Sequence, residues 1–169
     1  MNILTFDIEE WFHIKFDEEF FDDTYFDSFE KRLEKNMHFI LDLLDNNHQK
    51  ATFFCLGWVA RKYPSVVIEI DKRGHEIGSH SDMHKLLFSL NRQEFKEDLN
   101  NSISSIESLI NKKVKYYRAP SFSITNKNSW VFEELINFGI EIDCSIFPAK
   151  RSNGGFKNFI SNKPSIIKT

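Results

Sequence analysis

Residues 51–79, ATFFCLGWVARKYPSVVIEIDKRGHEIGS, contain the pattern that predicts the fold. The first five of these residues, 51–55, form a short apolar run that is typical of a buried strand. The pattern then predicts a short helix that ends before Pro64 and a second helix at about 65–72. The run 75–79 is a further strand. Strand, helices and strand in this order predict a βα unit whose two strands lie parallel.

The rest of the chain continues this alternation. Strands are expected at 2–7, 113–117 and 139–145, and helices at about 28–47, 92–110 and 128–138. Asp27 with Glu30, and Asn91 with Glu94, fit capping boxes at the starts of the first two of these helices. We therefore expect a single domain over residues 1–169, of the α/β class, built on a parallel sheet or barrel.

Composition excludes several classes of protein. The chain has 169 residues, with 41% hydrophobic and 28% charged residues, which is ordinary for a soluble globular domain. The net charge is −3 and the basic residues are scattered, so nucleic-acid binding is disfavoured. Cys55 and Cys144 stand in apolar runs without a CxxC partner and are expected to be buried thiols. No signal peptide or membrane span is visible, so we expect a cytoplasmic protein.

Two histidines provide the sharpest local signal. In GHEIGSHSDMH (74–84), His80 and His84 follow a predicted strand. If they lie on a helical turn, positions i and i+4 share a face, and both imidazoles can reach one metal ion. The alternative is a coincidental pair among the six histidines of the chain.

Three carboxylates end the first predicted strand, in TFDIEEW (5–11). If the chain stays extended, Asp7 and Glu9 point to the same face. The alternative is the acidic start of a loop. Two histidines and one carboxylate would leave an open position for water, as in catalytic zinc sites, and a second carboxylate can then accept a proton.

Arg118 stands at a strand end in YYRAPSFSI (116–124). It can orient a catalytic carboxylate through a bidentate pair, or it can form an ordinary surface ion pair. Taken by itself, the surface pair is the better interpretation.

These segments together resemble a known family. TFDIEEWF (5–12) resembles the first motif, TFDDG, of the polysaccharide deacetylases related to chitooligosaccharide deacetylase. HSDMH (80–84) resembles the second, H(S/T)xxH, RAPSF (118–122) the third, RxPY, and IDCSIFP (142–148) the fourth. The resemblance covers about residues 2–148, and several separated segments agree.

The resemblance implies a distorted (β/α) barrel and a hydrolase that removes an acetyl group from an N-acetylated sugar or polysaccharide. It implies a divalent metal, with Zn²⁺ as the first choice, and an N-acetylated carbohydrate as the partner. By position it assigns Asp7 as general base, His80 and His84 as metal ligands, Arg118 as the residue that holds Asp7, Ser81 as support for the histidine turn, and Asp143 to the fourth motif among the catalytic residues.

This chain departs from the family pattern in three places. The usual adjacent acid pair is replaced by a longer acidic run, and we choose Glu9 as third ligand because it shares a face with Asp7, with Glu10 as second choice. Ser121 precedes the aromatic Phe122 in the third motif. The final LxH motif, whose histidine normally acts as general acid, is absent. Because this acid is missing, a catalytically weak carbohydrate-binding remnant stays open as an alternative function. A metal amidase with a non-sugar substrate also stays open, since the motifs describe the chemistry better than the substrate.

Other aromatic and histidine residues are interpreted as structural. The acidic, aromatic segment 16–29 is expected to be a loop, His75 a core residue or a support for the site, and His13 an ordinary surface or packing residue. Trp11 is expected to pack the end of the barrel, with sugar binding as the alternative.

The number of strands predicts an incomplete or open barrel. About five strands can be read before residue 148, whereas closed barrels of this type need about seven or eight. Unpaired strand edges invite pairing with another chain, so self-association through an open edge is expected.

Overall fold

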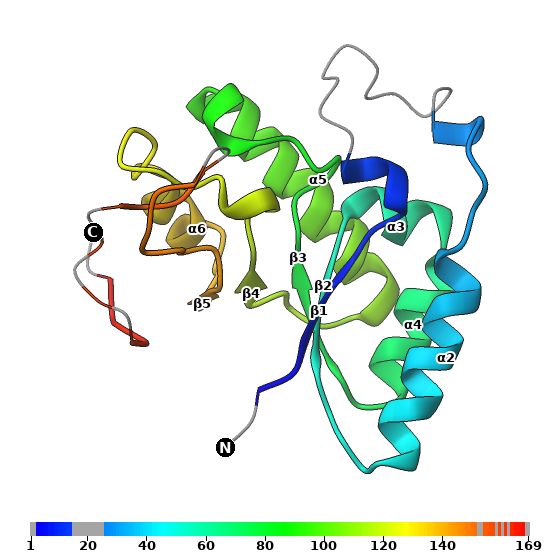
Figure 1. Cartoon of the computed structure of the whole chain (residues 1–169). Coiled ribbons are helices and arrows are strands. Elements are labelled where there is room, and N and C mark those ends of the chain that lie inside the picture. The colour runs from blue at the N-terminus through cyan, green and yellow to red at the C-terminus, as the bar shows by residue number, and fades with distance from the viewer. Residues whose placement is uncertain are drawn as a thin grey trace.

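A computed structural model describes residues 3–14, 26–151, 154–157, 159, 161 and 163–167. These residues contain one sheet of five parallel strands in the order β1-β2-β3-β4-β5 (Figure 1). The strands are β1 (Thr5–Ile8), β2 (Thr52–Cys55), β3 (Glu76–Ser79), β4 (Tyr116–Tyr117) and β5 (Ile142–Asp143). All five expected strands are therefore confirmed, each shorter than the run that predicted it.

Helices connect successive strands, as the alternating pattern predicted. They are α2 (Leu33–Asn46), α3 (Gly57–Lys62), α4 (Pro64–Lys72), α5 (Arg92–Ile110) and α6 (Val131–Asn137), with short 3₁₀ turns at Trp11–Ile14, Leu87–Ser89 and Pro120–Phe122. Figure 1 shows α2, α3 and α4 gathered on one side of β1–β3. The α/β class and the parallel sheet are confirmed.

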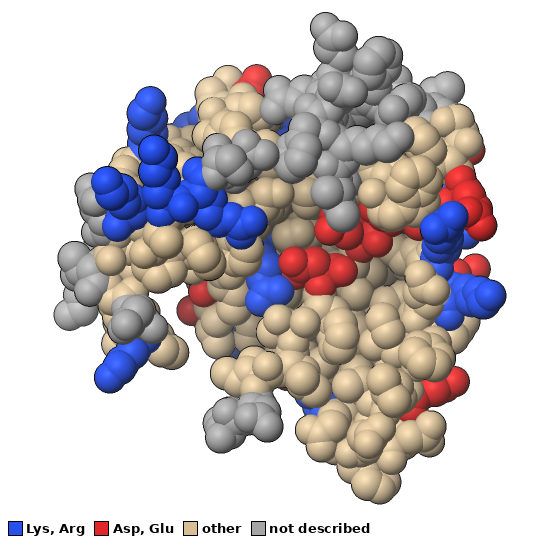
Figure 2. Space-filling view, viewed as in Figure 1, with Lys and Arg blue, Asp and Glu red and all other residues tan. Residues whose placement is uncertain are grey.

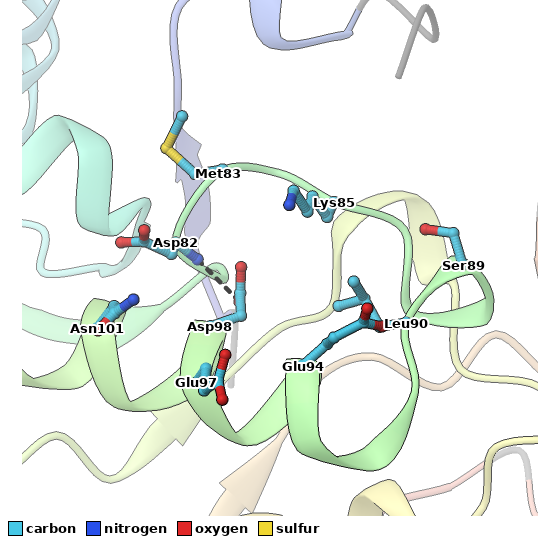
Figure 3. A pocket seen from close by; sticks show the side chains of 9 residues that line it. All are labelled: Asp82, Met83, Lys85, Ser89, Leu90, Glu94, Glu97, Asp98 and Asn101. Atoms are coloured by element: carbon cyan, nitrogen blue, oxygen red, sulfur yellow. Dashed lines mark hydrogen bonds between the residues drawn. The ribbon is translucent and has the colours of Figure 1, made fainter. Parts of the chain in front are cut away.

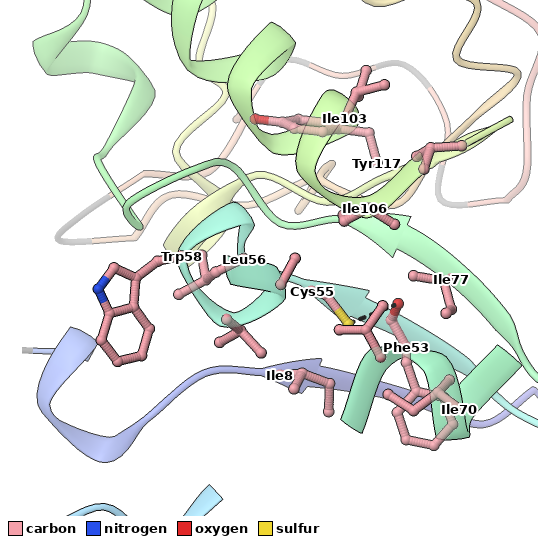
Figure 4. Close-up of a cluster of buried hydrophobic side chains, with 14 of the residues drawn as sticks. Ile8, Phe53, Cys55, Leu56, Trp58, Ile70, Ile77, Ile103, Ile106 and Tyr117 are labelled. Carbon is pink, nitrogen blue, oxygen red and sulfur yellow. Dashed lines mark hydrogen bonds between the residues drawn. The ribbon is translucent and has the colours of Figure 1, made fainter. Parts of the chain in front are cut away.

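The core lies between this sheet and its helices (Figure 4). Phe53 and Cys55 on β2 are completely buried, and Ile70 of α4 and Ile106 of α5 pack into the same cluster. The side chains of β2 alternate between the helices and the opposite face, where Phe54 lies. The helices thus fix the strands, and the strand ends can carry the site.

The start of α2 differs from the expected one. The helix begins at Leu33 without a side-chain cap from its own first residues, and the capping box of Asp27 with Glu30 is wrong. Instead, the buried carboxylate of Glu10 accepts hydrogen bonds from the backbone N–H groups of Arg32 and Leu33 at 3.0–3.1 Å. The cap is supplied from a distant segment, which no local pattern reveals. The predicted box of Asn91 with Glu94 on α5 is confirmed.

The sheet is open in the part of the chain that the structure describes. There β1 pairs only with β2, and β5 only with β4. This agrees with the expected incomplete barrel, while self-association through an edge stays a prediction. None of the helices built from described residues has the length and apolar character needed to cross a membrane. Most of the expected loop at 16–29 lies outside the described residues.

Both cysteines are free thiols. Cys55 is completely buried, as its apolar run predicted, whereas Cys144 is only half-buried. His75 is also buried, and its Nδ1 accepts a hydrogen bond from the backbone N–H of Ala51 at 3.3 Å. Cys55 belongs to the core and His75 packs against Phe53 within it, whereas the Cys144 side chain hydrogen-bonds Arg118.

Candidate functional site

The carboxyl ends of β1, β3 and β4 meet at one cleft of about 220 Å³. Parallel strands end at the same edge of a sheet, and loops there can bring distant residues together. The cleft is lined by Asp7, Glu9, His80, His84, Arg118, Ala119, Ser121 and Phe122. In the space-filling view, acidic and basic side chains lie next to each other near the middle of this face (Figure 2). Five of the six predicted site residues are thus brought together.

The segment from His80 to His84 is an irregular bend, so the predicted helical turn is wrong. Ser81 and His84 both have left-handed backbone conformations, with φ of 75° and 60°. The hydroxyl of Ser81 accepts a hydrogen bond from the backbone N–H of His84 at 3.0 Å. The support that the family resemblance assigned to Ser81 is therefore visible in this bend.

Glu9, His80 and His84 form a compact set of metal-binding atoms. One donor atom from each lies within 4.8 Å of the others. The Nε2 of His84 is 3.1 Å from Oε2 of Glu9, and donors on one tetrahedral Zn²⁺ lie about 3.3 Å apart. Oε2 of Glu9 is also buried without a hydrogen-bond partner among the described residues. The distances and the unpaired oxygen fit a divalent ion held by these three residues.

Backbone carbonyls orient both imidazoles. Nδ1 of His80 lies 2.7 Å from the carbonyl oxygen of Arg118, which can only accept a hydrogen bond, so Nδ1 carries the proton and Nε2 is left as a ligand atom. The ring of His84 hydrogen-bonds the backbone of His13. His13 is buried at 1% exposure, so its placement as a packing residue holds, but its support of His84 was not foreseen.

Burial shifts the pKa values of the three candidate ligands in directions that favour metal binding. It lowers the pKa of His84 to about 3, with a further contribution from neighbouring histidines, and it lowers the pKa of His80 as well. Both rings are therefore neutral at pH 7, the form that binds metals. Burial, followed by the charge of Asp7, raises the pKa of Glu9 to about 7. A positive ion here would relieve the cost of burying that carboxylate.

Asp7 and Arg118 form an ion pair across the sheet. Nη1 of Arg118 donates to Oδ1 of Asp7 at 2.7 Å, while Nη2 donates to the Thr5 hydroxyl at 3.0 Å. Arg118 thus holds Asp7, as the resemblance implied, but the guanidinium bridges two residues of β1 and does not form a bidentate pair with the carboxylate. The guanidinium also lies over the ring of Phe54, 4.2 Å from its centroid. Oδ2 of Asp7 points toward the metal-binding set, 3.9 Å from Nε2 of His80.

Asp143 does not line the cleft. It lies on β5, where its carboxylate accepts hydrogen bonds from the backbone and the hydroxyl of Ser145. The Ser145 hydroxyl in turn accepts from the backbone N–H of Ala119 at 2.7 Å. Burial raises the pKa of Asp143 to about 6. Asp143 is therefore connected, through Ser145, to Ala119 in the loop that follows β4 and lines the cleft.

The two neighbouring acids Glu9 and Glu10 separate clearly. Glu9 faces the cleft, whereas Glu10 is 1% exposed, caps α2 and accepts a hydrogen bond from the Tyr63 hydroxyl at 2.9 Å. The structure therefore favours Glu9 over Glu10 as the carboxylate donor. Trp11 is 41% exposed and packs edge-on against Phe12, as a packing residue would.

The comparisons with known proteins agree with the motifs. Residues 20–137, more than half of the chain, match the family model described as polysaccharide deacetylase. The chain therefore belongs to the polysaccharide deacetylase family. The matched residues include His80, His84 and Arg118, while Asp7 and Glu9 lie before them.

Several relatives are similar over part of their length. The chain is 34% identical to a peptidoglycan-N-acetylglucosamine deacetylase of Bacillus cereus over 96 residues, a match that covers 56% of this chain and 35% of that protein. It is 38% identical over 87 residues to a chitin deacetylase of Pestalotiopsis, covering 50% and 29%. The solved peptidoglycan deacetylase PdaC of Bacillus subtilis superposes with a TM-score of 0.60 and 25% identity, over 83% of this chain and 55% of that one. The matches thus span about a third of the two curated relatives.

Proposed function

We propose that this chain holds a divalent metal ion and removes acetyl groups from N-acetylated sugars or polysaccharides. The observation that carries the proposal is the convergence of Glu9, His80 and His84 with the Asp7–Arg118 pair in one cleft. The names of the relatives, deacetylases of peptidoglycan N-acetylglucosamine and of chitin, support N-acetylated carbohydrate as the substrate class.

Zn²⁺ is the proposed ion, with Glu9, His80 and His84 as its protein ligands. Two imidazoles and one carboxylate are a usual ligand set for catalytic zinc, although other first-row metals accept the same donors. When bound, such an ion supplies positive charge that polarises an acetyl carbonyl and lowers the pKa of a water molecule.

Asp7 is proposed as the general base. Arg118 occupies its Oδ1, so Oδ2 is the oxygen that accepts a proton from the attacking water. The water oxygen forms a bond to the acetyl carbon, the C–N bond then breaks, and acetate and the sugar amine are released. A backbone N–H at Ser121 or Phe122, which line the cleft, would stabilise the oxyanion.

The leaving nitrogen must also gain a proton. No histidine follows His84 in this sequence, so the proton would come from water or from protonated Asp7. The absence of a dedicated acid costs about 10²–10⁴ in rate. We therefore expect weak turnover from these 169 residues alone. This same absence is the observation that favours the second candidate, a carbohydrate-binding remnant that binds metal without turnover.

Acetate release tests the proposal. The purified chain is incubated with N-acetylglucosamine oligomers, peptidoglycan fragments and a non-sugar acetamide, with and without added Zn²⁺ or Co²⁺. We expect metal-dependent acetate release from the sugars, and none from His80→Ala. Metal uptake without any release would support the remnant, release only from the non-sugar amide would support an amidase, and no metal uptake would refute the site.

A further inference from the structure

The polar side of α5 lies against the loop that carries the two histidines. Asp98 of α5 lines a second pocket, of about 360 Å³, together with Asp82 and Met83 of that loop, and it does not line the cleft (Figure 3). Its Oδ2 accepts a hydrogen bond from the backbone N–H of Asp82 at 3.0 Å, and the backbone of Met83 also hydrogen-bonds its carboxylate. One carboxylate thus binds the two residues at the centre of the bend.

The bend needs such support because its conformation is unfavourable. Ser81 and His84 have φ of 75° and 60°, a region in which side chains crowd the backbone. Both residues border the peptide N–H groups that Asp98 binds. Without those hydrogen bonds the backbone can relax toward ordinary φ values, which would turn the two imidazoles away from each other.

Helix α3 holds the same loop from another side. The backbone N–H groups of Gly57 and Trp58 donate to the carbonyl oxygens of Ser81 and Asp82, each at 3.0 Å. The Asp82 carboxylate lies so close to α3 that a Cβ at Gly57 would collide with it. These contacts bind the carbonyl side of the loop, whereas Asp98 binds its N–H side, so the two anchors are complementary.

Arg61 completes the anchor on α3. Its guanidinium donates to both carboxylate oxygens of Asp82, at 2.6 and 3.1 Å. Arg61 thus binds the side chain of Asp82, whereas Asp98 binds its backbone N–H.

We propose that Asp98 is a positioning residue, which holds residues 80–84 in the conformation where the imidazoles of His80 and His84 can bind one metal ion. The proposal rests on the metal site of the proposed function. Asp98 forms no hydrogen bond or ion pair with either histidine side chain, so its effect on the metal passes through the backbone of Asp82 and Met83. Loss of such indirect contacts typically weakens metal binding by about 10–100-fold.

The buried state of Asp98 supports this role. Burial is the largest cause that raises its pKa, to about 7, and the charge of Asp82 adds to it. The backbone hydrogen bonds act in the opposite direction, because they stabilise the ionised form. A buried carboxyl group whose oxygens accept hydrogen bonds from a functional loop is typical of a residue that serves a functional site.

Co²⁺ titration tests the proposal through its visible absorption spectrum, which reports affinity and geometry without turnover. We expect Asp98→Ala to bind Co²⁺ about 10–100-fold more weakly and with an altered spectrum. Asp98→Asn keeps an acceptor oxygen and should restore affinity to within a few-fold. The matched control is Glu97→Gln, at the neighbouring position on α5, which lines the same pocket and whose carboxylate accepts a hydrogen bond from the side chain of Gln93.

Amide hydrogen exchange of the wild-type protein gives a second measurement that does not depend on a variant that folds. We expect slowed exchange at the N–H groups of Asp82 and Met83. Exchange of both at the rate of unprotected amides would overturn the proposal, as would folded Asp98→Ala that binds Co²⁺ within twofold of wild type. Wild-type protein that takes up no Co²⁺ would refute the metal site instead, and the exchange rates would still decide whether Asp98 holds the loop.

Discussion

The two adjacent acids of the first motif should have opposite roles, and substitution can separate them. Replacing Glu10 by alanine removes the acceptor for the backbone N–H groups of Arg32 and Leu33 and for the Tyr63 hydroxyl. Loss of a helix cap costs about 1 kcal/mol, and each buried donor left unpaired costs about 1–3 kcal/mol. Relief from burying a carboxylate offsets part of this cost. We therefore expect Glu10→Ala to lower the free energy of unfolding by about 3 kcal/mol.

Urea and thermal unfolding measure this effect. For a domain of this size, 3 kcal/mol corresponds to a fall in Tm of about 6–12 °C. The matched variant is Glu9→Gln at the neighbouring position. In the wild-type protein Oε2 of Glu9 is buried without a hydrogen-bond partner among the described residues. The free energy of unfolding of the metal-free variant should therefore lie within about 1 kcal/mol of the wild-type value. That variant should instead lose metal affinity by at least about tenfold. A Glu10→Ala protein that melts within 2 °C (about 0.5–1 kcal/mol) of wild type, or that loses metal while Glu9→Gln keeps it, would refute the assignment.

Three further predictions concern the base, its partner and pH. Asp7→Asn should abolish acetate release while Zn²⁺ affinity, measured by titration, stays within about tenfold; loss of metal would make Asp7 a ligand. Arg118→Lys should slow turnover, because one ammonium cannot bridge Asp7 and Thr5 and also cover the ring beneath them, and wild-type kcat would return Arg118 to a surface role. Burial lowers the pKa of His13 to about 4, so the unfolded chain takes up a proton below about pH 6.5 that the folded protein takes up only near pH 4. Stability that His13 contributes above pH 6.5 is thus lost as pH falls toward 4, by up to about 1.4 kcal/mol per pH unit. In His13→Asn the amide oxygen can replace Nδ1 as acceptor for the backbone N–H of Glu10. Urea unfolding at several pH values should then show a smaller dependence of the free energy of unfolding on pH between 4 and 6.5. An unchanged pH dependence would contradict the buried neutral state of His13.

The elements of this fold could be predicted because their signals are local. Apolar residues at period 3.6 locate α5, and its capping box with Asn91 and Glu94 depends on residues three positions apart. Alternation of strands and helices then requires parallel strands, and parallel strands place their carboxyl ends together. For this reason the residues that line the cleft could be named from segments as distant as β1 and β4.

The local form of the site depended on contacts that no short pattern contains. Spacing alone suggested a helical turn at His80–His84, but hydrogen bonds from α3 and α5 hold a bend with left-handed residues there. Asp98 carries a weak signal, since it stands three residues after the buried Phe95 on α5, yet nothing in the helix indicates which loop it meets.

The α/β class, the order of strands and helices along the chain and the chemical groups at the strand ends could all be read from the sequence, because periodicity and motif spacing are properties of neighbouring residues. The separate roles of the two adjacent acids follow from tertiary packing alone. Glu9 and Glu10 are adjacent and chemically identical, but in the segment that follows β1 one faces the cleft and the other faces the start of α2, more than 20 residues away. That choice depends on where the helix packs against the sheet, and packing between distant segments is what a local pattern cannot record.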